Sequence, residues 1–207
     1  MRYYIDTEFI NHKKQPKLLG LNTGKPIHTT ELISIGIVAE DGREYYAISN
    51  EFDVDAAWKE EWVRFNVLQP LHAEMCQCQG VYAKTHHYGL FEPFKSKSVK
   101  WMLKFTGQEQ YWIKQGVMRF LNDDPSPEFY GYFADYDWVV FCQLFGRMVD
   151  LPEGFPYYCR DLKQTMDELG LDGDWKKANC PDPVNEHHAL ADARWNMNLH
   201  KALLAVR

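Results

Sequence analysis

No stretch of the 207-residue sequence reaches the roughly 20 apolar residues that a membrane-spanning helix requires. The sequence also contains no internal repeat and no low-complexity linker. Its first residues pass directly into a strand-like pattern, which is not the pattern of a secretory signal peptide. We therefore expect a single domain over residues 1–207 that has no membrane partner and is located in the cytoplasm.

An excess of basic residues is also missing. The sequence has 23 Lys and Arg against 29 Asp and Glu, which gives a formal net charge of −6. Proteins that bind duplex nucleic acid tightly usually present a basic surface, so the composition argues against that class. An enzyme that acts on nucleic acid is not excluded, because a metal site lined by carboxylates itself lowers the net charge.

Cysteines number only five, and an odd number argues against a framework of disulfide bonds. We expect reduced thiols, with Cys142 in the core of an apolar helix. Cys76 and Cys78, followed by His86 and His87, invite comparison with a zinc site, but their spacing fits structural zinc sites poorly. The alternative is a loop with incidental Cys and His residues, and the sequence does not show whether these four bind anything.

Strand patterns open the chain. Residues 2–7 form a short strand pattern, and residues 31–40 are apolar and β-branched, which is typical of a strand buried on both faces. The Asp-Gly pair at 41–42 predicts a hairpin turn, with residues 43–52 as the returning strand. A further strand is expected over residues 127–134.

Helical patterns fill most of the remaining sequence. Apolar residues spaced three and four apart predict a helix over residues 107–123. Asp53 or Asp55 is a suitable N-cap for an earlier helix, and Gly170 is a suitable end for a later one. The other predicted helices span residues 55–68, 135–148, 160–170 and 187–206. Strands followed by alternating helices predict an α/β fold with helices packed on a mixed central β-sheet.

Two segments do not fit this regular pattern. Residues 11–30 are polar and contain two prolines, Pro16 and Pro26, and two glycines, Gly20 and Gly24, so we expect a long loop there. Residues 70–106 mix Pro, Gly, Cys, His and Lys without a clear period, so we expect an irregular insertion. Both segments are candidates for a place near a substrate entrance.

Acidic residues gather where the predicted elements begin or end. Asp6 and Glu8 end the first strand, Asp135 and Asp137 begin the helix after residues 127–134, and Asp192 lies near the start of the last helix. α/β proteins place ligand-binding groups at such positions. Carboxylates brought together from three segments repel one another unless cations balance their charge. Mg²⁺ prefers carboxylate oxygens, and two such ions can assist phosphodiester cleavage.

Three motifs occur in order along the chain. They are Asp-x-Glu at a strand end (Asp6, Glu8), an aromatic-Asp pair that opens an apolar helix (Tyr136–Asp137), and His-x-Ala-x-x-Asp from His187 to Asp192. In this order the sequence resembles the DEDDh 3′–5′ exonucleases, a family with a ribonuclease H-like fold. The stretches "ELISIGIVAEDGREYYAIS" and "WVRFNVL" are more specifically similar to the exoribonuclease AS-like branch of bacteria and phages. The resemblance covers nearly the whole chain.

The resemblance implies a role for each matching residue. Asp6, Glu8, Asp137 and Asp192 would hold two divalent ions, Mg²⁺ or Mn²⁺. His187 would be the general base, a task that suits histidine because its ordinary pKa lies near the operating pH. By the same resemblance, Thr7 and Phe9 are candidate substrate-binding residues, with Phe9 lying against the terminal nucleotide.

Two pairs of neighbouring residues compete for these roles. Asp135 and Asp137 lie two apart and point in different directions on a helix, so only one can face the ions. Asp137 matches the family's position, which leaves Asp135 to cap the helix or to sit in its first turn. His188 lies four before Asp192 and would share its helix face. The family places its histidine five before, which favours His187 and leaves His188 to point elsewhere, for example to solvent.

Other residues have plainer interpretations. Trp138, Phe141 and Phe145 recur at helical spacing, which indicates core residues and not a platform for bases. Asp192 has the alternative of pairing with Arg194 or Lys201 on a solvated helix face. The basic stretch that contains Lys95, Lys97, Lys100 and Lys104 is a solvated segment or, in the alternative, a contact to phosphates.

The expected function follows from the resemblance. It is a metal-dependent 3′–5′ exonuclease, acting on the 3′ ends of single-stranded RNA and releasing 5′-mononucleotides, in a bacterium or for a phage in its host. Trimming of single-stranded DNA by the same site is one alternative, and a non-catalytic nucleic-acid-binding module of the same fold is another. A homodimer is compatible with the sequence.

Overall fold

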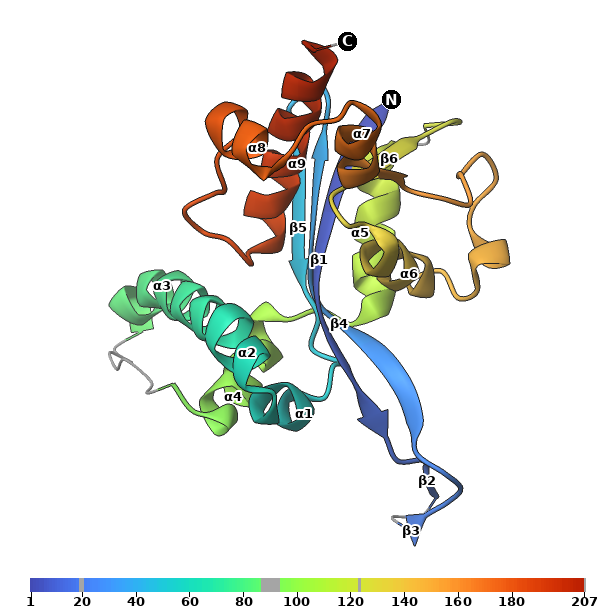
Figure 1. Ribbon diagram of the computed structural model, residues 1–207. Helices are drawn as coiled ribbons and strands as arrows, with labels where there is room; N and C mark the ends of the chain where they lie inside the picture. Colours follow the sequence, from blue (N-terminus) through green and yellow to red (C-terminus); the bar gives the residue numbers. More distant parts are fainter. Residues whose placement is uncertain (19–20, 87–93, 123, 207) are drawn as a thin grey trace.

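The computed structural model describes residues 1–207 except 19–20, 87–93, 123 and 207. A five-stranded mixed sheet with the order β5-β4-β1-β6-β7 forms its centre (Figure 1). Strand β1 is antiparallel to β4 and parallel to β6, β4 is antiparallel to β5, and β6 is parallel to β7. These strands are β1 (Arg2–Lys14), β4 (Ile27–Ala39), β5 (Glu44–Ile48), β6 (Glu128–Gly131) and β7 (Arg160–Asp161).

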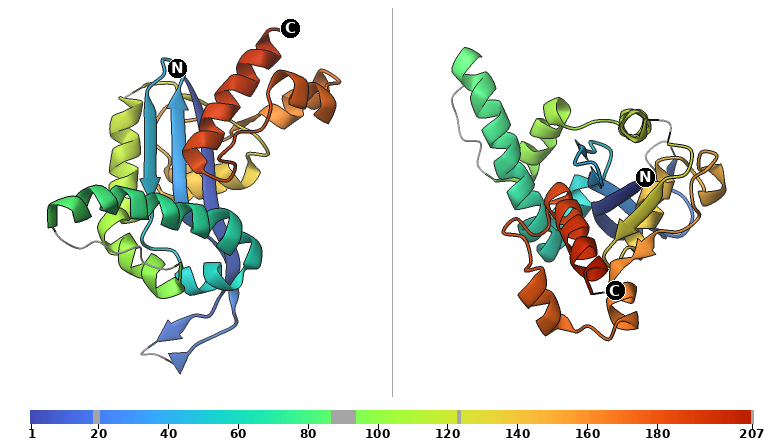
Figure 2. Two further views of the ribbon diagram at one scale, coloured as in Figure 1. Left: turned by 90° about the vertical axis from the view of Figure 1, so that its left-hand side faces the viewer. Right: turned by 90° about the horizontal axis from the view of Figure 1, so that it is seen from above.

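Helices cover both faces of this sheet, so the predicted α/β architecture is confirmed (Figures 1 and 2). On one face lie α5 (Gln110–Leu121) and α6 (Asp135–Gln143), whose apolar side chains form a core with strand residues such as Ile5, Ile35 and Phe129. On the other face lies α9 (Ala189–Leu204), where Ala193 packs on Tyr4 and Val38. Trp138, Phe141 and Phe145 are buried, as predicted from their spacing, and Cys142 is buried, as predicted from its place in an apolar helix.

A helical lobe is attached below the sheet. It contains α1 (Val54–Lys59), α2 (Glu61–Val63), a π-helical turn (Arg64–Leu68), α3 (Gln69–His86) and α4 (Ser96–Thr106). Asp53 caps α1 by accepting hydrogen bonds from two backbone N–H groups, as expected for one of the two candidate caps. The expectation of an irregular segment over residues 70–106 is wrong for the parts described, because most of them belong to α3 and α4. Residues 87–93, including His87, lie outside the described residues, as do the side chains of Cys78 and His86.

A β-bulge in β4 connects the sheet to this lobe. Glu8 lies opposite Ser34 and Phe9 opposite Leu32, so Ile33 is an extra residue without a partner in β1. Its side chain packs in the core of the lobe together with Ile10, whereas Leu32 packs in the core of the sheet. The bulge thus lets one pair of strands contribute to two separate cores.

Beyond the bulge, β1 and β4 continue as a long hairpin. Their pairing extends to Lys14 opposite Ile27, and the tip contains the short strands β2 (Lys17–Leu18) and β3 (Leu21–Asn22). The expectation of a loop over residues 11–30 is therefore wrong for most of its described residues. Polar residues on both sides hid the strands, because no described side chain of this hairpin is fully buried and no alternating pattern results.

The rest of the chain closes the domain around the carboxyl end of β6. A 3₁₀ turn (Met148–Asp150), α7 (Leu162–Glu168) and α8 (Gly173–Asn179) precede a loop that leads into α9. Helix α8 and strand β7 were not expected from the sequence. No helix among the described residues has both the length and the apolar composition to cross a membrane.

Candidate active site

The site forms where β6 stops and leaves one edge of β1 open. Strand β6 pairs with only three residues of β1, Arg2 to Tyr4, and then ends at Gly131. Side chains from later elements take over the hydrogen bonding of that edge. Asn196 of α9 donates to the carbonyl oxygen of Ile5 at 2.8 Å, and the N–H of Thr7 donates to Oδ1 of Asp137 at 2.8 Å. These two hydrogen bonds to the open edge place α6 and α9 beside the acids of β1.

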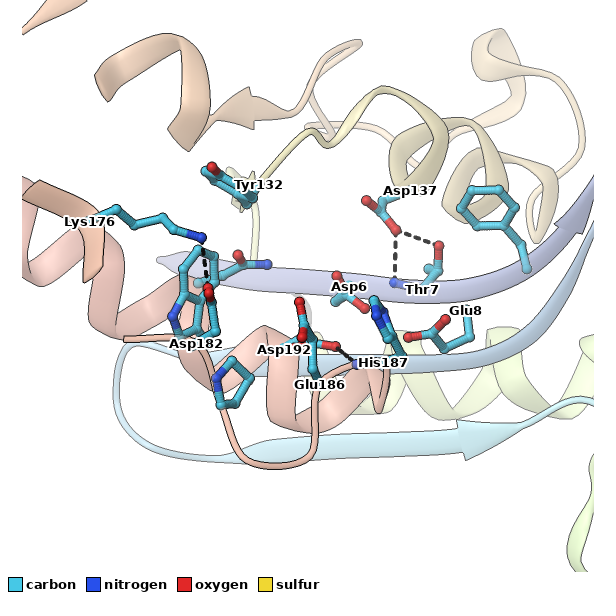
Figure 3. A pocket seen from close by; sticks show the side chains of 14 residues that line it. Asp6, Thr7, Glu8, Tyr132, Asp137, Lys176, Asp182, Glu186, His187 and Asp192 are labelled. Atoms are coloured by element: carbon cyan, nitrogen blue, oxygen red, sulfur yellow. Dashed lines mark hydrogen bonds and ion pairs between the residues drawn. The ribbon is translucent and has the colours of Figure 1, made fainter. Parts of the chain in front are cut away.

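Asp137 is the residue of its pair that faces β1. It lies in the first turn of α6, is buried, and accepts a second hydrogen bond at 2.6 Å from the hydroxyl of Thr7 (Figure 3). Asp135 is exposed in the same turn, as predicted for the residue that does not face the site. Asp161 fixes the start of this helix, because its carboxylate accepts a hydrogen bond from the N–H of Ala134.

Asp192 reaches the site from the first turn of α9. The backbone N–H of His187 donates to its Oδ2 at 2.8 Å. Arg194, which the sequence offered as an ion-pair partner of Asp192, pairs with Glu44 at 2.6 Å. Helix α9 can begin this close to β4 because Gly36 has no side chain: a Cβ there would lie 2.3 Å from the carbonyl oxygen of Ala189.

The two adjacent histidines have different surroundings. His187 lines the pocket with a left-handed backbone (φ 66°), and its ring meets the edge of Trp62 at a centroid distance of 4.7 Å. His188 is the N-cap of α9 and does not line this pocket. Its ring stacks on Tyr46, and its Nε2 lies 3.3 Å from a carboxylate oxygen of Glu74 in α3. His188 therefore points to the helical lobe. It does not point to open solvent, the direction suggested as an example in the sequence analysis.

The pocket is lined by all seven residues to which the family resemblance assigned a catalytic, metal-binding or substrate-binding role. Its volume is about 230 Å³. Phe9 also lines the pocket, and its ring stacks on Tyr136 at a centroid distance of 5.6 Å. The lining residues that were proposed from the sequence are Asp6, Thr7, Glu8, Phe9, Asp137, His187 and Asp192.

Sequence reasoning missed several other lining residues. Lys176 of α8 binds Asp182 at 2.7 Å, and its ammonium group lies over the rings of Tyr132 and Trp195 at 5.4 and 5.1 Å (Figure 3). Asn196 follows Asp192 by four residues, so the helical period could have placed it on the same face. Nothing in the sequence pattern marked Lys176, because α8 itself was not predicted.

Crowding of the carboxylates changes their acidity. Burial, with the charges of Asp192 and Asp137 added, raises the pKa of Glu8 to about 8. Burial also raises the pKa of Asp6 well above its ordinary value, and the other three acids add to this effect. The pKa values of Asp137 and Asp192 are raised by burial to about 6, against the opposing hydrogen bonds from Thr7 and His187.

These side chains fit a divalent cation. The ligand atoms of Glu8, His187 and Asp192 lie within 4.8 Å of one another, and Asp6 and Asp137 line the same pocket. Carboxylate oxygens are suitable ligands for both Mg²⁺ and Mn²⁺. A cation would replace the protons that the raised pKa values indicate, because both balance the same concentrated negative charge.

The fold and the pocket thus define an α/β protein with an acidic site suited to a divalent metal. Comparison with known proteins identifies the family. Residues 1–204 match the profile of the 3′-5′ exoribonuclease Rv2179c-like domain, and the chain belongs to this family. It is 35% identical over 196 residues to the 3′-5′ exoribonuclease Rv2179c of Mycobacterium tuberculosis strain H37Rv, a match that covers 94% of this chain and 88% of the relative. The same values hold for the 3′-5′ exoribonuclease MT2234.1 of strain CDC 1551.

Proposed function

We propose that this protein is a metal-dependent 3′–5′ exoribonuclease of the DEDDh group, with a ribonuclease H-like fold in a single domain over residues 1–207. The observation that carries the proposal is the convergence of Asp6, Glu8, Asp137, His187 and Asp192 on one pocket. Membership of the Rv2179c-like family supports RNA as the substrate. Action at 3′ ends, a homodimer and a cytoplasmic location remain predictions.

The four carboxylates would hold two divalent ions, Mg²⁺ or Mn²⁺. When bound, such ions supply positive charge that activates a water molecule and neutralises the departing oxygen. Thr7 holds Asp137 in place through its two hydrogen bonds, and the N–H of His187 does the same for Asp192. The side chains are therefore oriented before substrate arrives, which lowers the reorganisation needed during the reaction.

His187 is the proposed general base. Its ring nitrogen would take a proton from the attacking water, whose oxygen would bond to phosphorus. The bond from phosphorus to the 3′-oxygen would break, and that oxygen would take up a proton from solvent. The product is a 5′-mononucleotide, and the shortened RNA keeps a 3′-hydroxyl. The stacked rings of Phe9 and Tyr136 offer a flat surface at the pocket rim, and stacking is tolerant of base identity.

The test is a digestion time course with 5′-labelled single-stranded RNA and its DNA counterpart. Both are incubated with Mg²⁺, Mn²⁺ or EDTA, and the products are resolved by size. We expect a metal-dependent ladder that shortens from the 3′ end of RNA, absent in Asp6→Ala and retained in Asp135→Ala, the exposed control. Faster cleavage of DNA would transfer the proposal to DNA trimming. Binding without cleavage under any metal would indicate a non-catalytic nucleic-acid-binding module.

A further inference from the structure

The hairpin formed by residues 11–30 has a charge opposite to that of the whole chain. It contains four lysines and two histidines and no acidic residue, although the net charge of the chain is −6. It projects from the body beyond the helical lobe (Figures 1 and 2). We call this segment the basic arm. A positive segment that extends away from a negative body is suited to a polyanion.

Only part of this charge is neutralised by the protein. Glu31, at the base of the basic arm, binds Lys14 at 2.6 Å and lies 3.2 Å from His12. Lys13 and Lys25 are exposed, and neither forms an ion pair with another described residue. These two ammonium groups are therefore available to an external anion.

The position of Lys13 relative to the pocket is set by the strand that they share. Side chains alternate along β1, so Lys13 lies on the same strand face as Thr7 and Phe9. Its partner across the hairpin is the exposed His28, which shares that face. Glu8 and Lys13 are five residues apart, which corresponds to about 17 Å of extended strand.

We propose that the basic arm binds the phosphate backbone of single-stranded RNA, several nucleotides upstream of the 3′ end in the pocket. The inference rests on the proposed function. At about 3.4 Å per stacked nucleotide, a strand of about five nucleotides spans the distance from the pocket to Lys13. A second copy of the chain is the rival occupant. RNA is favoured because the hairpin's described surface is mainly polar and because Lys13, one of its two free cations, lies on the strand that leads from the pocket.

The test compares two double variants that lose the same charge. The first combines Lys13→Gln and Lys25→Gln, and the control combines Lys163→Gln and Lys201→Gln. The control lysines lie on α7 and α9, at the opposite end of the molecule (Figure 1). KM and kcat are measured with Mg²⁺ on a trinucleotide and on a 20-nucleotide RNA. Binding of the longer RNA is measured by fluorescence anisotropy in EDTA over a series of salt concentrations.

Loss of two phosphate contacts on single-stranded RNA should lower the slope of log affinity against log salt by about 1.4. The same relation predicts a KM about tenfold higher for the long RNA at 0.2 M salt, with the trinucleotide unaffected. The control pair should behave like the wild type on both substrates.

Three results would overturn the inference. An unchanged salt slope would mean that the lysines do not contact phosphates. Equal loss on the trinucleotide and the long RNA would mean that the variant disturbs the pocket. A wild-type dimer that dissociates in the variant, measured by light scattering, would assign the basic arm to a second copy. Failure of the proposed function is distinguishable, because the wild type would then cleave neither RNA while the EDTA binding series still reports on the arm.

Discussion

Thr7 donates two hydrogen bonds to one oxygen of Asp137, from its backbone and from its hydroxyl. The backbone donor exists because β6 has ended and no neighbouring strand uses that N–H. The hydroxyl adds a second bond that fixes the rotation of the carboxylate. Residues that orient metal-binding carboxylates in this way commonly matter for activity without touching substrate.

Replacing Thr7 with Val removes the hydroxyl while keeping the shape of the side chain. We expect a loss of about 10- to 100-fold in activity or metal affinity, the range seen when partners of metal ligands are removed. The measurement is kcat as a function of Mn²⁺ concentration. Thr7→Ser, which keeps the hydroxyl, should retain most of the activity, and equal loss in both variants would contradict the orienting role.

The raised pKa values of the acids predict how stability depends on pH without metal. An acid whose pKa is higher in the folded than in the unfolded state holds its proton longer when folded, so stability falls as pH rises between the two values. The window runs from about pH 4, the ordinary carboxylate range, through about 6 for Asp137 and Asp192 to about 8 for Glu8. Each group contributes a slope of up to about 1.4 kcal/mol per pH unit there.

The expected result is a thermal midpoint in EDTA that decreases from pH 5.5 to pH 8.5. Saturating Mg²⁺ should raise the midpoint most at the alkaline end, because cations replace the missing protons. Glu8→Gln should flatten the upper part of the profile in EDTA. A flat profile in the wild type would show that the acids do not share one crowded site.

At the scale of elements, the start of α9 is joined to the helical lobe through His188. Its side chain accepts a long hydrogen bond of 3.4 Å from the N–H of Ala191, stacks on Tyr46 and approaches Glu74 of α3. The hydroxyl of Tyr46 also donates to Glu74. The residue that carries the proposed base, His187, directly precedes this contact, so the lobe helps to set its position.

His188→Asn separates the two effects of this residue. Asparagine is a good N-cap, so the free energy of unfolding should stay within about 1 kcal/mol of the wild type. The contacts to Tyr46 and Glu74 are lost, so we expect kcat to fall about tenfold or more from misplacement of His187, with KM little changed. Urea unfolding and steady-state kinetics measure the two quantities. A wild-type kcat would show that the lobe does not position the base.

The elements that could be predicted from the sequence are those with one buried face. Helices α5, α6 and α9 and strand β4 bury regular apolar sets, and these sets produced the periodicity that predicted them. The basic arm and α8 have no fully buried side chain among their described residues, so their sequences show no apolar periodicity. The acids of the pocket were predictable from motif order. The hydrogen bonds of Thr7 and the position of Lys176 depend on where β6 ends and how α8 packs, which no local pattern encodes.

At the scale of the whole molecule, the basic arm lies outside the hydrophobic cores of the sheet and of the lobe. Among the described residues, the buried core of the sheet and of the lobe comes from positions before 11 or after 30. His12 and Thr29 face each other across the hairpin, so a two-residue turn can join them.

Replacing residues 13–28 with Asn-Gly should therefore leave a folded protein. We expect a thermal midpoint within a few degrees of the wild type, because little buried surface is lost. Hydrolysis of a trinucleotide should be unchanged. Circular dichroism and a trinucleotide assay measure these outcomes, and aggregation of the shortened chain would show that the basic arm is needed for folding.

The edge of β1 that β6 leaves unpaired has a consequence for the aggregation of the protein. An unpaired strand edge is a place where another chain can add a strand and start aggregation. Here the edge is occupied by Asp137 and Asn196, and the buried charges around it discourage any incoming strand. The carboxylates proposed to bind metal would then also reduce self-association of the protein. Selection on these acids would act on solubility as well as on catalysis, so a variant that loses Asp137 is expected to lose both.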